Sequence, residues 1–261
     1  MVVGACLAML TAGCGSVSAP APPGDQGAEA TQPAKEQSGA TQETAFPSPH
    51  GLPITVKEIG PTQAMVDLQV VTLFNQASKQ AFSESMVELN DSLGGFVSAV
   101  RDSGQFQANA LETLLITPPP GSIGARRLLI VGLGDSSQAS LDLMKKVGAV
   151  VAREAVRERA TSVAFAPTLR DQSFNKLDTG EVGAAVVEGA IPAYDTELRL
   201  QQQALDGCFA IKHLYYEAGA AYYSDVVQKV APAVKEATAQ VNQRSDEPFG
   251  KTGPQSKKCR I

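Results

Sequence analysis

Short apolar segments alternate with amphipathic segments through residues 51–245, and this alternation constrains the fold more than any other feature. Residues 65–74, MVDLQVVTLF, are mostly apolar, which is typical of a strand buried on both faces of a sheet. Residues 127–131, RLLIV, form another expected strand. Further strands are expected at residues 54–59, 114–116, 162–165 and 209–215. Strands that alternate with helices predict an α/β fold with a largely parallel or mixed sheet.

Capping signals locate the helices between these strands. Ser140 is placed to cap a helix whose apolar residues recur at helical spacing. Asp178 and Glu181 have the spacing of a capping box, and Pro192 is expected to stop the helix that they begin. A last helix is expected over residues 224–241, where valines recur on one face.

The N-terminal segment predicts export and lipid anchoring. Residues 1–12 form an uncharged apolar run that is too short to cross a bilayer and suits a signal peptide. The run ends in Leu-Thr-Ala-Gly-Cys, which resembles the bacterial lipobox. We therefore expect a signal peptide over residues 1–13 and lipid on Cys14, with an ordinary signal peptide or a buried apolar helix as the alternatives. The expected location is the cell envelope, with the domain facing the periplasm or the exterior and the membrane as a partner through the anchor.

Composition then divides the rest of the chain. Residues 14–50 are rich in Pro, Ala, Gly, Ser, Thr and Gln and cannot bury enough apolar surface to fold, so we predict a disordered tether. Residues 51–245 form the expected domain, and residues 246–261 form a polar tail.

The cysteines fit the expected export. Cys6 would leave with the signal peptide, whereas Cys208 and Cys259 would remain as a possible disulfide pair. Two unpaired thiols, with Cys208 as a small core residue, are the alternative.

Charge and histidine content exclude several function classes. The net charge is −5, which argues against a nucleic-acid partner. His50 and His213 are the two histidines of the chain, so no histidine metal site is expected, and His213 is interpreted as structural within its strand. The acidic residues are scattered, and we expect neither a metal nor another cofactor.

Two pairs of glycines could surround an anion. Gly94 and Gly95 precede an apolar stretch that could begin a helix, and Gly132 and Gly134 follow an expected strand. Backbone N–H groups at such positions can approach a phosphate. The dinucleotide fingerprint is incomplete, however, because residue 137 is serine. Tight turns are the alternative role of these glycines.

Several of these segments together resemble a known family. Residues 94–95, 112–116, 127–134 and 183–190, followed by Tyr194 and Asp195, resemble the N-terminal domain of the leucine aminopeptidase family, peptidase family M17. The resemblance covers residues 54–241. It implies a macro-domain-like fold in three layers, with a central mixed β-sheet flanked by helices.

The resemblance also bears on catalysis. In that family, catalysis belongs to a separate C-terminal domain that binds two metal ions around an Asn-Thr-Asp-Ala-Glu-Gly-Arg segment, and this sequence contains no such segment. We therefore expect a stand-alone, non-catalytic, membrane-anchored module that binds a partner protein or a small ligand. Two alternatives stay open. One is an accessory or regulatory component of a leucyl metalloaminopeptidase. The other, by fold analogy, is a site for ADP-ribose or a similar nucleotide at the four glycines.

Overall fold

Seven strands and five α-helices make up the part of the chain that the computed structural model describes, residues 41–78 and 81–244, and they alternate one by one from β5 onward. These residues all belong to the unit Ala40–Ile261. The strands are β1 Glu43–Pro47, β2 Pro53–Lys57, β3 Leu68–Phe74, β4 Thr113–Ile116, β5 Arg127–Gly134, β6 Ser162–Ala166 and β7 His213–Glu217. The helices are α1 Glu84–Ser92, α2 Phe96–Asp102, α3 Leu141–Arg157, α4 Thr179–Gln202 and α5 Tyr223–Asn242.

The strands form one mixed sheet in the order β1-β2-β7-β6-β3-β5-β4. The five inner strands run parallel to one another, whereas the two edge strands, β1 and β4, are antiparallel to their neighbours. Every residue of β3 is buried, as expected for a strand covered on both faces.

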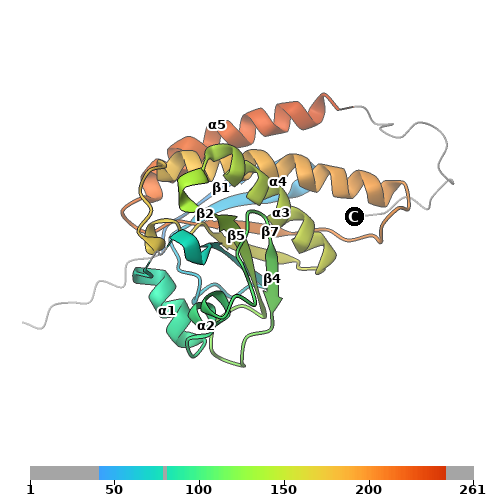
Figure 1. The fold of residues 1–261 in the computed structure, drawn as a ribbon. Coiled ribbons are helices and arrows are strands. Elements are labelled where there is room, and N and C mark those ends of the chain that lie inside the picture. Colours follow the sequence, from blue (N-terminus) through green and yellow to red (C-terminus); the bar gives the residue numbers. More distant parts are fainter. Residues whose placement is uncertain (1–40, 79–80, 245–261) are drawn as a thin grey trace, which may run out of the picture. The chain divides into compact units, whose positions relative to one another are not determined.

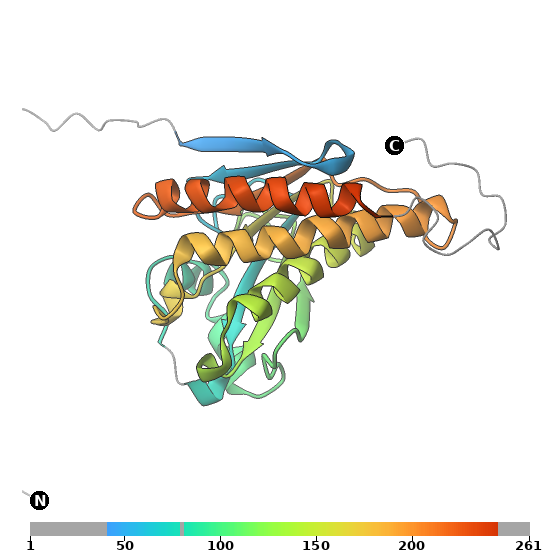
Figure 2. The same ribbon diagram turned by 90° about the horizontal axis from the view of Figure 1, so that it is seen from above.

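Helices cover both faces of the sheet (Figure 1). Helices α3, α4 and α5 lie side by side on one face, which Figure 2 shows from above, and α1 and α2 lie on the other. The alternation of side chains along β5 separates the two cores, since Leu129 and Val131 pack under α3–α5 and Leu128 and Ile130 pack towards α1 and α2. The three-layer, macro-domain-like α/β fold is therefore confirmed.

The expected caps of the two long helices are also confirmed. The side chain of Ser140 accepts a hydrogen bond from the backbone N–H of Leu143, and that of Asp178 accepts one from Glu181. The expected stop at Pro192 is wrong, because α4 continues to Gln202. Beyond the proline, residues such as Leu198 are buried in the core shared with α3 and α5, and this burial offsets the lost backbone hydrogen bond.

Two strand boundaries also differ from expectation. Strand β3 begins at Leu68 rather than at Met65, whose side chain is 83% exposed. Strand β7 spans His213–Glu217, because residues 209–212 precede its pairing with β6 and β2.

The expected domain boundary at residue 51 is wrong, because a strand precedes it. Strand β1 lies within the segment interpreted as tether and pairs antiparallel with β2. Its residues are alternately exposed and half-buried, and Phe46 packs against the main core. An edge strand has only one neighbour, so a polar segment with a single large apolar residue can form one. The predicted signal peptide, Cys14 and the tail at 246–261 lie outside the described residues. No helix in the described ranges combines the length and the apolar character that crossing a membrane requires.

Candidate functional site

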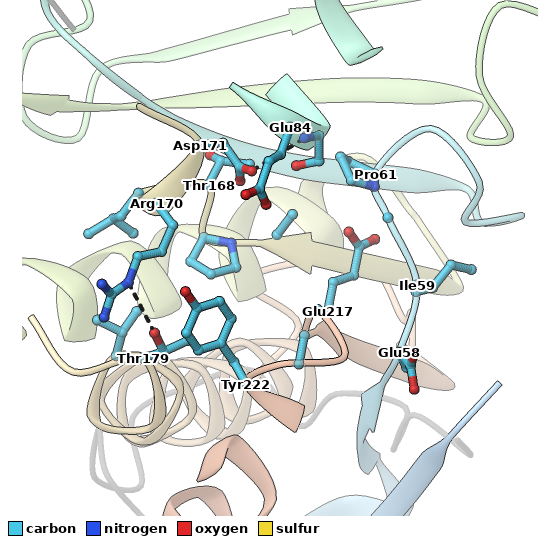
Figure 3. A pocket seen from close by; sticks show the side chains of 18 of the residues that line it. Glu58, Ile59, Pro61, Glu84, Thr168, Arg170, Asp171, Thr179, Glu217 and Tyr222 are labelled. Atoms are coloured by element: carbon cyan, nitrogen blue, oxygen red, sulfur yellow. Dashed lines mark hydrogen bonds between the residues drawn. The ribbon is translucent and has the colours of Figure 1, made fainter. Parts of the chain in front are cut away.

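A pocket of about 340 Å³ lies at the carboxyl ends of β2, β7 and β6 (Figure 3). Its walls come from the segments that follow these three strands, together with the first turns of α1 and α4. Neighbouring parallel strands end at the same edge of a sheet, so their following loops converge there, and ligands of open α/β sheets bind at this edge. The position of the pocket follows from the strand order.

The wall that follows β6 is fixed to β3 by two buried polar side chains. The hydroxyl of Thr168 donates to the carbonyl of Thr72 at 2.8 Å and accepts from the N–H of Thr72 at 3.1 Å. The amide of Gln172 accepts from the N–H of Phe74 at 2.8 Å and donates to the carbonyls of Thr72 and Thr168, each at 3.0 Å. Strand β6 ends at Ala166, so these side chains satisfy backbone groups of β3 that have no strand partner on that side.

Glu217, the last residue of β7, lies at the bottom of the pocket. The residue is only 4% exposed, and neither carboxylate oxygen has a hydrogen-bond partner among the described residues. Burial raises the pKa of this carboxyl group to about 8, and the nearby amide of Gln69 partly opposes this rise although it does not reach hydrogen-bond geometry with either oxygen. A buried, unpaired carboxyl group is costly to the fold, and such groups concentrate at functional sites.

Three more acidic residues line the pocket. Asp171 accepts a hydrogen bond from the backbone N–H of Ser85 at 3.3 Å, and burial raises the pKa of its carboxyl group. Glu84 begins α1, and its charge also raises the pKa of Asp171. Glu58 follows β2, and its carboxylate accepts a hydrogen bond from the side chain of Gln42 at 2.9 Å.

Arg170 is the one basic residue among the described residues that line the pocket. Its guanidinium group donates to the Thr179 hydroxyl and to the Leu177 carbonyl, each at 3.3 Å. It also lies over the ring of Tyr222, 5.4 Å from the centroid. The one basic side chain among the described lining residues thus already has hydrogen-bond acceptors at the start of α4 and an aromatic ring beside it.

The four glycines predicted as an anion site do not line this pocket. Gly94 and Gly95 connect α1 to α2, and their N–H groups donate to the backbone carbonyls of Asp91 and Asn90. Gly132 and Gly134 belong to β5, and their N–H groups donate to the carbonyls of residues 112 and 108. A Cβ atom at Gly132 would lie 2.2 Å from the carbonyl oxygen of Asn109, so this glycine permits close packing of the backbone.

The histidines and the described cysteine also lie away from the pocket. His213 begins β7, at the opposite end of that strand from Glu217, and its side chain is exposed. His50 contacts buried Asp195 on α4. Cys208 takes part in a disulfide, whereas Cys259, the partner predicted for it, lies outside the described residues. Over residues 41–78 and 81–244, no three His, Cys, Asp or Glu side chains gather where they could hold a metal ion together.

Sequence reasoning missed the pocket. Glu217 ends a strand, and an acidic residue at the carboxyl end of an otherwise apolar strand is a signal that could have marked it. The neighbours of β7 could not be read from local patterns, because β2 and β6 are distant in the sequence. Without the strand order, Glu58, Glu84 and Asp171 appear as unrelated surface charges.

Known proteins resemble this chain in fold and in sequence. The Oceanobacillus iheyensis macrodomain with ADP superposes with a TM-score of 0.53 at 9% identity, covering 76% of this chain and 99% of that one. This likeness shows the fold alone.

Curated relatives match about half of this chain. The probable cytosol aminopeptidase of Thermosynechococcus vestitus is 26% identical over 135 residues, which are 52% of this chain and 26% of the relative. That of Roseiflexus castenholzii is 30% identical over 139 residues, which are 53% of this chain and 24% of the relative. The matched part of the chain thus spans about a quarter of the length of these relatives.

Residues 70–202, about half of the chain, match the N-terminal domain of the cytosol aminopeptidase family. The matched range runs from β3 to the end of α4 and so contains the centre of the sheet, the buried helix pair α3 and α4, and the loop after β6. The chain therefore belongs to the cytosol aminopeptidase family, of which these residues form the N-terminal domain.

Proposed function

We propose that this chain is a non-catalytic binding module of the cell envelope, anchored by lipid on Cys14, and that its ligand occupies the pocket at the carboxyl edge of the sheet. One observation carries the proposal. The pocket is large enough for a small organic molecule, and it holds a buried carboxyl group that the described residues leave without a hydrogen-bond partner.

Binding is favoured over catalysis by the surroundings of Glu217. A carboxyl group with a pKa near 8 could act as a general acid, but catalysis of this kind needs a second reactive group within hydrogen-bond reach. Neither histidine nor cysteine occurs among the described residues that line the pocket, and Glu217 hydrogen-bonds to none of them. The site therefore has the features of a recognition pocket.

A ligand screen with a blocked pocket tests the proposal. Gly219 lines the pocket, and a Cβ atom there would lie 4.0 Å from the Tyr222 ring, so Gly219→Leu places a side chain in the cavity. We expect compounds of a metabolite library to raise the melting temperature of the wild type and not that of this variant, because a ligand that binds only the folded state stabilises it. Gly207→Leu is the control, since, among the described residues, the only side chain close to its added Cβ is Arg159 and neither residue lines the pocket. If no compound raises the melting temperature of the control variant while leaving that of the pocket variant unchanged, the binding role is refuted.

The anchor has its own test. Cys14 follows an apolar run and small residues that suit lipoprotein processing, and Pro- and Ser-rich residues follow it. We expect the wild-type protein to stay with the membrane fraction after a salt wash and Cys14→Ala to lose that attachment. Recovery of the wild type in the soluble fraction, with an unmodified Cys14 by mass spectrometry, would contradict the anchor.

A second candidate is an accessory component of an aminopeptidase, which the family membership favours. It predicts that the purified chain changes the rate at which a cytosol aminopeptidase from the same cell hydrolyses a leucyl substrate. A nucleotide ligand is supported less well. The similar Oceanobacillus structure contains ADP, but here four acidic residues line the pocket and disfavour a diphosphate, and the one arginine already has other partners.

A further inference from the structure

We infer that the ligand of this pocket carries a positively charged group, an ammonium or a guanidinium, on an apolar body, and that Glu217 is the anionic partner of that group. The inference deepens the proposed function and rests on it, since it names the chemical class of the ligand. It draws on three independent features: the charges around the pocket, the unpaired carboxyl group at its bottom and the character of its walls.

The charges around the pocket are predominantly negative. Glu58, Glu84, Asp171 and Glu217 come from the ends of β2 and β7, the start of α1 and the segment after β6, whereas Arg170 is the one cation among the described lining residues. The Arg170 guanidinium already has two hydrogen-bond acceptors and an aromatic face. In a cavity partly shielded from water, this excess of acidic groups attracts a cation and disfavours an anion.

Glu217 indicates where in the pocket a cation would bind. Figure 3 shows its side chain rising from the end of β7 into the space that Glu84 borders from the opposite side. A cation in that space would contact a carboxylate that has no other hydrogen-bond partner among the described residues. Burial penalises an unpaired charge strongly, so this carboxyl group ionises favourably only when a ligand brings the opposite charge and N–H donors.

The walls define the rest of the ligand. Apolar side chains from the segments after β2, β6 and β7 and from α4 border the cavity, and the Tyr222 ring stands beside them. The apolar residues that matter here are Ile59, Leu169, Leu177, Val182 and Ala218. An aliphatic or aromatic body of moderate size fits such walls, whereas a sugar or a phosphate chain would leave polar groups unpaired against them.

The inference predicts a proton release on binding. The pKa of Glu217 is about 8, so near pH 7 its carboxyl group is mostly protonated before a ligand binds. Pairing with a cation stabilises the ionised carboxylate. The ionisable groups around it are Glu58, Glu84, Asp171 and Arg170 in the pocket, with Tyr222 at its wall. Lys57, on β2, lies opposite Glu217 of β7 in the sheet register. Its ammonium group, however, forms an ion pair with Glu43 at 3.2 Å. Affinity for a permanent cation should therefore rise from pH 6 to pH 8 and level off above that range.

Calorimetry on the full chain with two matched probes tests the inference. The probes are 4-phenylbutylguanidinium, which stays charged over this pH range, and 4-phenylbutylurea, its neutral counterpart of nearly equal shape. We expect the guanidinium to bind at least tenfold more tightly than the urea at pH 8 and to release close to one proton at pH 7. Glu217→Gln should abolish both the preference and the rise of affinity with pH.

Two further variants control for structure. Glu58→Gln removes a pocket carboxylate that is already hydrogen-bonded to Gln42, so it should change guanidinium affinity by less than threefold. Residue 84 is exposed at the start of α1, so the Glu84→Gln variant should fold normally. It should bind guanidinium severalfold more weakly than the wild type, which keeps the test valid even if Glu217→Gln folds poorly.

Several outcomes would overturn the inference. Equal binding of the urea and the guanidinium would show that charge is not recognised, and so would an unchanged preference in Glu217→Gln. ADP binding that Gly219→Leu abolishes would show an anion site, and absence of guanidinium binding at millimolar concentration would exclude the cation. The proposed function would survive each of these results if the library screen finds any ligand that depends on the open pocket.

Discussion

The imidazole Nε2 of His50 lies 2.8 Å from Oδ1 of Asp195, a side chain with no exposed surface. The other carboxylate oxygen accepts hydrogen bonds from Arg199 at 2.8 Å and from Arg244 at 2.9 Å. His50 follows β1, Asp195 and Arg199 lie on α4, and Arg244 follows α5. Burial alone would raise the pKa of Asp195, but hydrogen bonds from Arg199, His50 and Arg244 outweigh it and hold that pKa below its usual value. One carboxylate thus joins the segment after β1 to α4 and to the segment after α5.

Replacing this carboxylate should destabilise the whole domain. Asp195→Asn keeps the size of the side chain but removes the buried negative charge to which Arg199, which is 14% exposed, is paired. Removing one member of a buried ion pair costs about 3–5 kcal/mol, and we expect a loss near the lower end because His50 and Arg244 reach solvent. Urea denaturation measures the loss. Asp142→Asn is the control, since its pair with Lys146 is largely exposed and contributes about 0.5 kcal/mol or less. Equal losses in the two variants would contradict a structural role of Asp195.

Glu217 should make the stability of the domain fall as pH rises. Its pKa is about 8 in the fold and near 4.5 in the unfolded chain, so between these values the folded state holds a proton that the unfolded state has released. The contribution of this proton is fully present below pH 4.5 and is lost as pH rises through 8. Each pKa unit corresponds to about 1.4 kcal/mol. As pH rises across that interval, the free energy of unfolding of Glu217→Gln should therefore increase by several kcal/mol relative to that of the wild type. Unfolding free energies of both proteins from pH 5 to pH 9 give the answer, and parallel curves would rule out the raised pKa.

The contact between α3 and α4 should tolerate no side chain at Gly189. A Cβ atom there would lie 1.7 Å from the carbonyl oxygen of Lys145, and one at Gly148 would lie 1.9 Å from that of Val186. Gly189→Ala gains about 1 kcal/mol of helix propensity but forces the two backbones apart. We expect a net loss of about 2 kcal/mol or more by chemical denaturation. Gly60→Ala should change stability by under about 0.5 kcal/mol, because nothing lies within 4 Å of its added Cβ. A stabilised Gly189→Ala would show that the helices separate easily.

Local patterns were sufficient where the local sequence alone determines structure. Strand β5 follows from an apolar run, and Ser140 and Asp178 cap helices because their side chains satisfy the first N–H groups of the same helix. Pro192 shows the limit of such patterns, since the burial of α4 between its neighbours outweighs the helix-breaking preference. Strand β1 was missed because its polar residues pair only with β2 at the edge of the sheet.

The candidate site required information that no local pattern contains. The segments that follow β2, β6 and β7 meet only because these strands are neighbours in the sheet. The glycines that resembled an anion site have their N–H groups bonded within the backbone. Glycine patterns alone therefore could not distinguish close packing from ligand binding.

Gln172 should be essential to the pocket wall and to stability together. Its side chain is fully buried and makes three hydrogen bonds to backbone groups, one of them as the acceptor for the N–H of Phe74. Gln172→Ala would leave that N–H buried and unpaired and open a cavity beside β3, so we expect a loss of about 3 kcal/mol. Amide hydrogen exchange at Phe74 should accelerate more than exchange at Leu129 in the neighbouring strand, because the damage begins at the end of β3. Gln138→Ala removes an exposed glutamine and should leave both measurements unchanged. If Gln172→Ala matches this control in stability and exchange, the hydrogen bonds of Gln172 do not hold the wall in place.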